Sequence, residues 1–440
     1  MLINVLLLAV LTAYYLRIVR LHGRENVLAP KSFYAGINLL RITPYMASVL
    51  ADPDVVDVRV RQAIGAVNLN EVLTVYLACE LLGAVVFFSL WRGRSADWTG
   101  RPSLRPAASF RPGLPTIGVL VCLGLALVGL RVQAAGGLGF LLANLALRAE
   151  ITAGYGFLVT PAYACFALAV VAGAQRLASA RTPSNWALFL GVMLVGAVGM
   201  SLFGGRKDSL LLGATALVAH AYFVRPLRWS SPVFPIAFLA VVVYTYFLGA
   251  ARQLGGLDSV SADPASVLLD GLQNLSAFFK TVSYVDTYLF IVAHFQQAEY
   301  WWLSVFQSFP ASFVPSLLYP DKPPVDEGVY IRTLLEGQFL TPPAPARVLY
   351  PSSLPPETLG NGYAAFGVPG VAAFFAVKAW FFRRAFRIRL RQWQALPLVF
   401  LVCFAYNFQV SPLRFVQLTQ LLLICCACNV LIRLFRSARR

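Results

Sequence analysis

Several arginines of this sequence stand at or near the ends of apolar runs, where charge is costly unless it is paired or used. Arginine offers a planar fork of donors that matches phosphate oxygens and stays charged. Four guanidinium groups facing one cavity would therefore suit a pyrophosphate. The candidates, with the lysine that follows one of them, are Arg148, Arg206, Lys207, Arg252 and Arg414. Any one of them could instead extend to lipid headgroups, as basic side chains at the ends of spans often do.

A reaction at a diphosphate also needs a group that takes the proton of an attacking hydroxyl. Four titratable side chains compete for this role: Glu150, Asp208, Glu357 and His294. Each has a structural alternative. Asp208 could cap the hairpin that begins at Gly204, and Glu357 could be a carboxylate favoured at a helix start by the helix dipole. His294 could pack within an aromatic run.

Two further stretches could contact sugars or lipid chains. Residues 268–309 are rich in aromatic side chains and predict helices that lie at the membrane interface. Residues 310–356 are rich in proline and exclude a long regular helix. Glycines around Tyr363 leave space for a sugar to approach the backbone closely. The candidate contacts from the aromatic stretch are Lys280, Trp301 and Trp302, and the glycine-rich segment that follows residue 356 adds Tyr363.

The elements that position these residues must be membrane helices. The chain is 58% hydrophobic and 12% charged, which leaves too little polar surface for a soluble protein of 440 residues. Spanning a bilayer takes ~20 mostly apolar residues. About eleven runs, with ten to thirteen as the range, approach that length. They are residues 2–18, 32–50, 70–91, 114–131, 155–175, 185–203, 208–224, 232–249, 362–382, 394–411 and 413–432.

The distribution of charge predicts the orientation of these spans. Alternate loops carry 22 of the 36 basic residues. This count requires that the run 32–50 is a span, despite Arg41 and Pro44 within it. Because cytoplasmic loops are enriched in Lys and Arg, the N-terminus is expected outside and the C-terminus inside. The net charge of +17 then needs no nucleic-acid partner.

The same alternation of inside and outside loops divides the chain into three parts. Residues 1–250 form an N-terminal transmembrane bundle, 251–361 a long extracytoplasmic loop, and 362–440 C-terminal transmembrane helices with a basic cytoplasmic tail. A pair of additional spans within 272–309 would keep the parity and is an open alternative. The fold class expected is an all-α, polytopic integral membrane protein.

Short motifs on this plan resemble the Wzy-type polymerases of O-antigen and exopolysaccharide repeat units. Three stretches between about residue 115 and residue 432 resemble the family's outer loops. They are Gly136-Gly137-Leu138-Gly139-Phe140 with Arg148 and Gly154-Tyr155-Gly156, then Gly204-Gly205-Arg206, then Tyr319-Pro320-Asp321-Lys322-Pro323 with Gly360-Asn361-Gly362-Tyr363. Many relatives carry an acidic residue in the last of these motifs, where this chain has Asn361.

The resemblance implies a GT-C-like membrane glycosyltransferase of the bacterial inner membrane. Such an enzyme transfers the growing glycan from undecaprenyl diphosphate to the non-reducing end of an incoming lipid-linked repeat unit on the outer face. A chain-length-regulating co-polymerase is a possible partner. Because the diphosphate is already a good leaving group, cationic stabilisation and a base suffice. The sequence has no acidic metal motif and no nucleotide loop, so no metal or cofactor is expected.

Two other functions stay open. An O-antigen ligase has a similar plan but passes the glycan to a lipid A core, and an outer histidine such as His294 would favour it. A flippase or another transporter of lipid-linked sugars would show charged or broken helices at mid-membrane depth, and often two similar halves. Glu80 is a mid-span acid, but no internal repeat is evident, and a transporter does not need the long outer loop.

Overall fold

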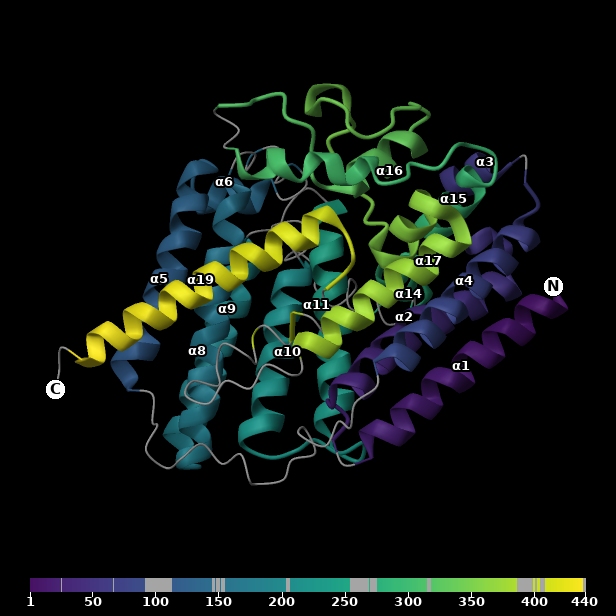
Figure 1. Cartoon of the computed structure of the whole chain (residues 1–440). Helices are drawn as coiled ribbons and strands as arrows, with labels where there is room; N and C mark the ends of the chain where they lie inside the picture. Colours follow the sequence, from purple (N-terminus) through teal and green to yellow (C-terminus); the bar gives the residue numbers. More distant parts are fainter. Residues whose placement is uncertain are drawn as a thin grey trace.

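A computed structural model describes most of the chain as a set of packed helices (Figure 1). No strand occurs in the part of the chain that the model describes. That part leaves out residues 25, 66, 92–112, 145–146, 148–150, 152–154, 203–205, 254–268, 270–274, 315–317, 386–398, 400–401, 404–407 and 438–440.

Six of the described helical segments are long and apolar enough to cross a membrane, each with 20 to 29 residues. They are α1 (Leu2–Gly23), α4 (Leu69–Leu90), α5 (Leu114–Ala134), α8 (Val159–Ser179) with the 3-10 turn before it, α9 (Pro183–Leu202) and α17 (Glu357–Ala385). At 1.5 Å per residue such helices match a hydrocarbon core of ~30 Å. The prediction of a helical membrane protein is therefore confirmed.

Four more helices occupy ranges that the sequence predicts as spans. They are α2 (Pro30–Ala51), α10 (Arg206–Phe223), α11 (Val233–Gln253) and α19 (Pro412–Ser437). The helix α2 contains Pro44 and buries polar groups, and the described apolar stretches of the other three are shorter than 18 residues. Most of the predicted span 394–411 lies outside the described residues. The full count of eleven spans therefore stays a prediction, as does the GT-C-like arrangement.

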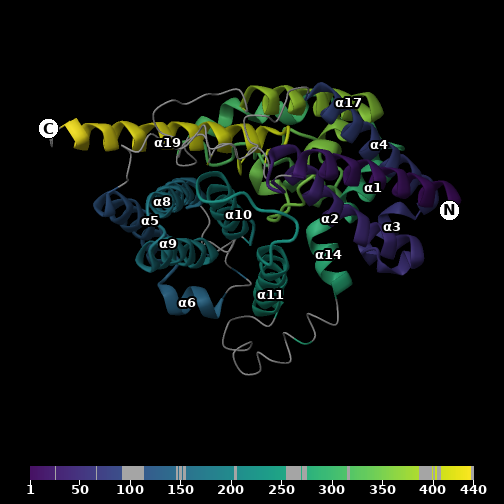
Figure 2. The same cartoon turned by 90° about the horizontal axis from the view of Figure 1, so that it is seen from below.

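Buried apolar side chains form two separate clusters. One joins α1, α2, α4 and α17 with the short helix α3 (Val58–Ile64), around side chains such as Tyr45 and Tyr76. The other joins α5, α8, α9 and α10 around Phe166 and Leu212. Seen from below, α5, α8, α9 and α10 lie apart from α1, α2 and α4, and α11 lies between the two groups (Figure 2). The membrane helices thus form two packed units.

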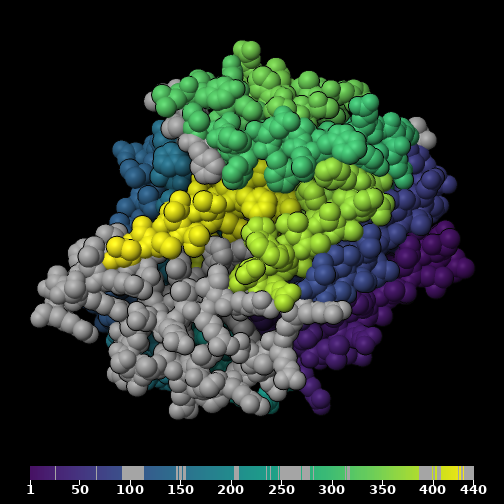
Figure 3. All heavy atoms as spheres, in the orientation of Figure 1, coloured from purple at the N-terminus to yellow at the C-terminus, as the bar shows by residue number. Residues whose placement is uncertain are grey.

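The long loop predicted at 251–361 covers one end of both units, as the green atoms at the top of Figure 3 show. Its described elements are α14 (Leu275–Ser283), α15 (Val285–Phe295), α16 (Glu327–Leu335) and three 3-10 turns, Ser304–Ser308, Pro310–Phe313 and Ala346–Val348. The helices α3, α6 (Leu138–Ala143) and α16 lie at this end in Figure 1, while the α1–α2 and α10–α11 connections lie at the opposite end. The two connections at the opposite end are among those that the charge pattern predicts as cytoplasmic, and the orientation in the membrane stays a prediction.

The aromatic run of this loop differs from the expected interfacial helices. The helix α15 is buried on nearly all sides, and Val285, Leu289 and Ile291 have no exposed surface. Its apolar side chains pack against α3, α4 and α17. The described parts of α14 and α15, with 9 and 11 residues, are each shorter than a membrane span. Aromatic residues here fill a protein core.

The helix α17 is broken in the middle. Gly367 has φ 66° and ψ −145°, a conformation essentially confined to glycine. Carbonyls that lose their helical partners at such a break need other donors. The amide of Trp301 donates to Ala364 O at 2.8 Å, and the amide of Trp302 donates to Ala365 O at 3.1 Å. The middle of the long loop therefore completes the hydrogen bonding of this helix. The helix begins at Glu357, ahead of the predicted loop boundary at residue 361.

Candidate functional site

For most of the residues predicted to bind diphosphate, the structure does not describe the side chain. Arg148 and the candidate base Glu150 fall outside the described residues. Arg206 and Lys207 begin α10, and Arg252 lies in the last turn of α11, but their side chains are not among those described. Asp208 lies in the first turn of α10 and is half-buried. The predicted cluster of cations therefore stays a prediction.

Arg414 is the predicted phosphate ligand whose side chain is described. It lies in the first turn of α19, where its amide donates to the hydroxyl of Ser411 at 3.2 Å. Its guanidinium donates to the side chain of Gln417, one turn further along. The side chain is half-buried, and its helix contacts the 3-10 turn Ser304–Ser308 of the long loop. This position fits an anion-binding role.

His294 packs among aromatic rings near the end of α15. Its ring centroid lies 5.8 Å from Phe290, 4.9 Å from Phe295 and 6.2 Å from Phe339. Burial lowers the pKa of His294, because the charged imidazolium loses water contacts. These contacts agree with the structural interpretation of the histidine.

The predicted sugar contacts divide into buried and exposed residues. Lys280 donates to the carbonyl of Val55 at 2.7 Å and faces Asp286 at 3.6 Å, so it fastens the loop after α2 to α14. Tyr363 and Trp301 are buried in the protein. Trp302, at 62% exposure, is the member of this set that can still meet a ligand from outside.

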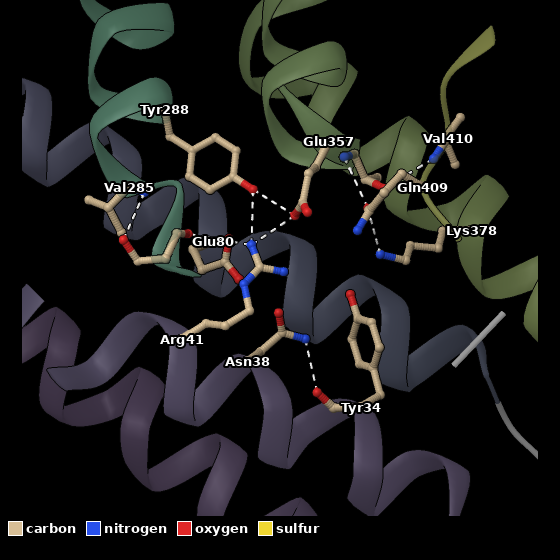
Figure 4. A network of polar contacts seen from close by, with 12 residues as sticks. Tyr34, Asn38, Arg41, Glu80, Val285, Tyr288, Glu357, Lys378, Gln409 and Val410 are labelled. Atoms are coloured by element: carbon tan, nitrogen blue, oxygen red, sulfur yellow. Dashed lines mark hydrogen bonds and ion pairs between the residues drawn. The ribbon is translucent and has the colours of Figure 1, made fainter. Parts of the chain in front are cut away.

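Glu357 is the candidate base that the structure places in a polar site. Its Oε2 accepts from Arg41 at 2.8 Å and from the hydroxyl of Tyr288 at 2.8 Å (Figure 4). Arg41 also donates weakly to the carbonyl of Ser283 at 3.4 Å. The side chains of Arg41 and Glu357 are only 17% and 8% exposed. The arginine that complicates the predicted span 32–50 is thus explained by a partner from α17.

A second polar group lies on one side of this ion pair. Lys378, from the other half of α17, donates to Gln409 Oε1 at 3.0 Å. The hydroxyl of Thr358 donates to the same oxygen at 2.6 Å and accepts from the amide of Val410 at 3.1 Å. The ammonium lies 4.7 Å from the ring centre of Tyr34, within the range of a cation–π contact. These bonds connect both halves of α17 to the segment before α19.

Between these groups lies a small cavity. It is enclosed by α2, α4, α15, α17 and the segment at Gln409, and its space for water centres is about 20 Å³, enough for about one water. Arg41, Glu80, Glu357 and Lys378 all line it, so two cations face two carboxylates. Glu80 accepts from the hydroxyl of Tyr15 at 2.9 Å. Such a site can hold an anionic oxygen or exchange a proton.

A buried carboxyl also stands beside the glycine-rich motif at the head of α17. Glu327, in the first turn of α16, accepts from the amide of Asn361 at 3.1 Å and is 4% exposed. Burial, together with the neighbouring Asp326, raises the pKa of Glu327 to about 7. The chain therefore brings a carboxyl to Asn361 from a different helix.

Comparison of the chain with protein-family models, curated proteins and solved structures finds no match. Its site is therefore interpreted from its own chemistry.

Sequence reasoning missed the pairing that builds the site. In the sequence, Arg41 is only a charge that argues against a span at 32–50, and Glu80 is only an isolated acidic residue within a span. Lys378 and Gln409 are not candidates at all. The usable signal is the rarity of charge within apolar runs: an ionisable residue there is usually paired or functional. Arg41, Glu80 and Lys378 are all ionisable residues within apolar runs, and grouping them for that reason would point to the cavity.

Proposed function

We propose that the chain is a membrane glycosyltransferase that polymerises oligosaccharide repeat units carried on undecaprenyl diphosphate. The observation that carries this proposal is the Arg41–Glu357 pair at the head of α17, directly before the glycine-rich motif and beneath the long loop. A carboxylate held there by two donors is positioned to accept the proton of a sugar hydroxyl. The resemblance in the loop motifs supports the same class of reaction.

The reaction needs few groups from the protein. The bond between the anomeric carbon of the growing glycan and the diphosphate oxygen breaks, and a bond to the acceptor hydroxyl forms. The hydroxyl proton goes to Glu357, and the diphosphate leaves with both electrons of the broken bond. Arg414, on the helix that contacts the long loop, stabilises that charge, and Arg148, Arg206 and Arg252 are proposed to join it.

The orientation proposed places the long loop outside the cell membrane, the N-terminus in the periplasm and the C-terminus in the cytoplasm. Support comes from two of the basic connections, which lie at the end of the molecule opposite the long loop. Lipid-linked substrate would then approach between the membrane helices, and the exposed Trp302 would meet either its sugars or the lipid surface.

The test is a glycan ladder from a deletion strain complemented with the wild type and with variants, run beside the lipid-linked intermediates. We expect Glu357→Gln and Arg206→Ala to yield single repeat units attached to their final acceptor and no polymer. Glu299→Gln, an exposed control on the same loop, should restore the wild-type ladder. Unattached lipid-linked polymer would instead identify a ligase, and a wild-type ladder from Glu357→Gln would remove that residue as the base.

A second candidate is a transporter of lipid-linked sugar. Two observations favour it: the break of α17 at Gly367, and the buried charges of Glu80 and Lys378 among membrane helices. The same strain separates the two functions. Accumulation of single lipid-linked units on the cytoplasmic face, without any on the outer face, would mean transport.

A further inference from the structure

The cavity between α2, α4 and α17 contains one ion pair whose charges are fixed. Arg41 keeps its proton in any protein environment, because the guanidinium is too strong a base to lose it. Glu357 contacts that guanidinium at 2.8 Å and accepts a further hydrogen bond from Tyr288, so it is held as a carboxylate. While no substrate hydroxyl occupies the site, neither group gives up or takes up a proton.

Glu80 and Lys378 are held differently. Their side chains are 5% and 2% exposed, and neither forms an ion pair with another side chain that the structure describes. Glu80 receives one neutral hydrogen bond, from Tyr15. Lys378 donates one, to Gln409, and otherwise meets the aromatic rings of Tyr34, Phe87 and Phe375. Burying either charge without a contacting partner is costly.

Few other groups around Glu80 and Lys378 can bind or release a proton. The ionisable or polar groups that face the two residues come from every element packed against them. They are Tyr15 from α1, Tyr34, Asn38 and Arg41 from α2, Tyr76 and Cys79 from α4, Tyr288 from α15, Glu357 from α17, and Gln409 before α19. Among them Arg41 and Glu357 cancel each other, and the rest are neutral. The charge of the cavity is therefore set by Glu80 and Lys378.

We propose that Glu80 and Lys378 form a proton-binding site within the membrane-spanning part of the protein. One proton moves from the ammonium of Lys378 to the carboxylate of Glu80, leaving a neutral amine and a neutral acid, and both forms have the same net charge. The cavity has space for about one water to carry it. Taking up a second proton gives the cavity a charge of +1.

This site is linked to the shape of α17. Glu357 and Lys378 lie on opposite sides of the break at Gly367. A change of the bend there would change the distance between the fixed ion pair and the amine, so proton uptake and the bend of α17 are linked. The inference does not depend on the proposed reaction, because either a polymerase or a transporter can contain such a site.

The experiment is an infrared titration of the purified chain in lipid nanodiscs from about pH 5 to about pH 9, which brackets the range where a buried carboxyl and amine exchange protons. The signal is the C=O band of a protonated carboxyl shielded from solvent. Because the buried Glu327 titrates in the same pH range, every protein in the series, including the reference, carries Glu327→Gln. We expect a titrating band in this reference that is lost when Glu80→Gln is added. The matched control is Glu71→Gln, an exposed residue on the same helix, which should leave the band unchanged.

Two substitutions of Lys378 complete the test. Lys378→Met removes the amine, so Glu80 should stay protonated and its band should no longer titrate. Lys378→Arg supplies a cation that does not release its proton, so Glu80 should stay ionised and the band should be lost. A band that survives Glu80→Gln overturns the proposal, and so do Lys378 variants that titrate like the reference. If Glu80→Gln fails to fold, as judged by gel filtration, Lys378→Arg decides.

Discussion

The raised pKa of Glu327 predicts how the free energy of unfolding changes with pH. Its carboxyl is buried beneath α16 and accepts a hydrogen bond from Asn361, and its pKa lies at about 7 instead of 4.5. The folded protein therefore binds more protons than the unfolded chain between these two values. By linkage, the free energy of unfolding must fall as the pH rises from about 4.5 to about 7. A difference of this size corresponds to about 3 kcal/mol.

Replacing Glu327 by glutamine should remove this pH dependence. The glutamine keeps an oxygen for the amide of Asn361, and its own amide can donate to Asn361 Oδ1, which has no hydrogen-bond partner among the described residues. Above pH 7 the variant should therefore be more stable than the wild type by up to about 3 kcal/mol. Below about pH 4.5 the two should be alike, because the acid is then neutral in both states.

The assay is thermal unfolding of both proteins in detergent over a series of pH values. Glu299→Gln serves as the control, because Glu299 is exposed on the same loop. The control should follow the wild type at every pH. If Glu327→Gln also follows the wild type, the carboxyl is ionised in the folded protein and the reasoning from its burial fails.

Two further substitutions test the packing around the site by the same unfolding assay. Gly367→Ala should destabilise by about 1–3 kcal/mol, since the new Cβ would strain a positive φ and meet the hydroxyl of Tyr300, whereas Gly213→Ala on α10 has open space and should not destabilise. Tyr45→Phe removes the 2.6 Å hydrogen bond to the half-buried Asp286 and should cost about 1 kcal/mol, whereas unchanged stability would show that this bond does not stabilise the fold.

The helices of the membrane domain are largely predictable from the sequence. Apolar runs of near-spanning length locate α1, α4, α5 and α9 within a few residues, because the bilayer fixes helix length. The charged run 32–50, which positive-inside parity requires as a span, lies within the helix α2, and its place in the membrane stays a prediction. Local composition and loop charge are sufficient for this level of structure.

The site is much less predictable, because its partners are far apart in the chain. Arg41 and Glu357 are separated by 316 positions, and no local pattern links them. The aromatic run containing α15 shows a second limit. Phenylalanine and tyrosine suit both a membrane interface and a protein core, so composition alone does not distinguish the two.

The break in α17 has a consequence for biogenesis. Two carbonyls of this membrane helix, at Ala364 and Ala365, receive their donors from Trp301 and Trp302. Those donors are synthesised about sixty residues earlier, so they are already present when α17 enters the bilayer. Without them, each buried carbonyl would lack a hydrogen-bond partner at a cost of about 1–3 kcal/mol. The middle of the long loop thus supplies donors that this helix needs, and a shortened chain that lacks Trp301 and Trp302 is expected to assemble poorly in the membrane.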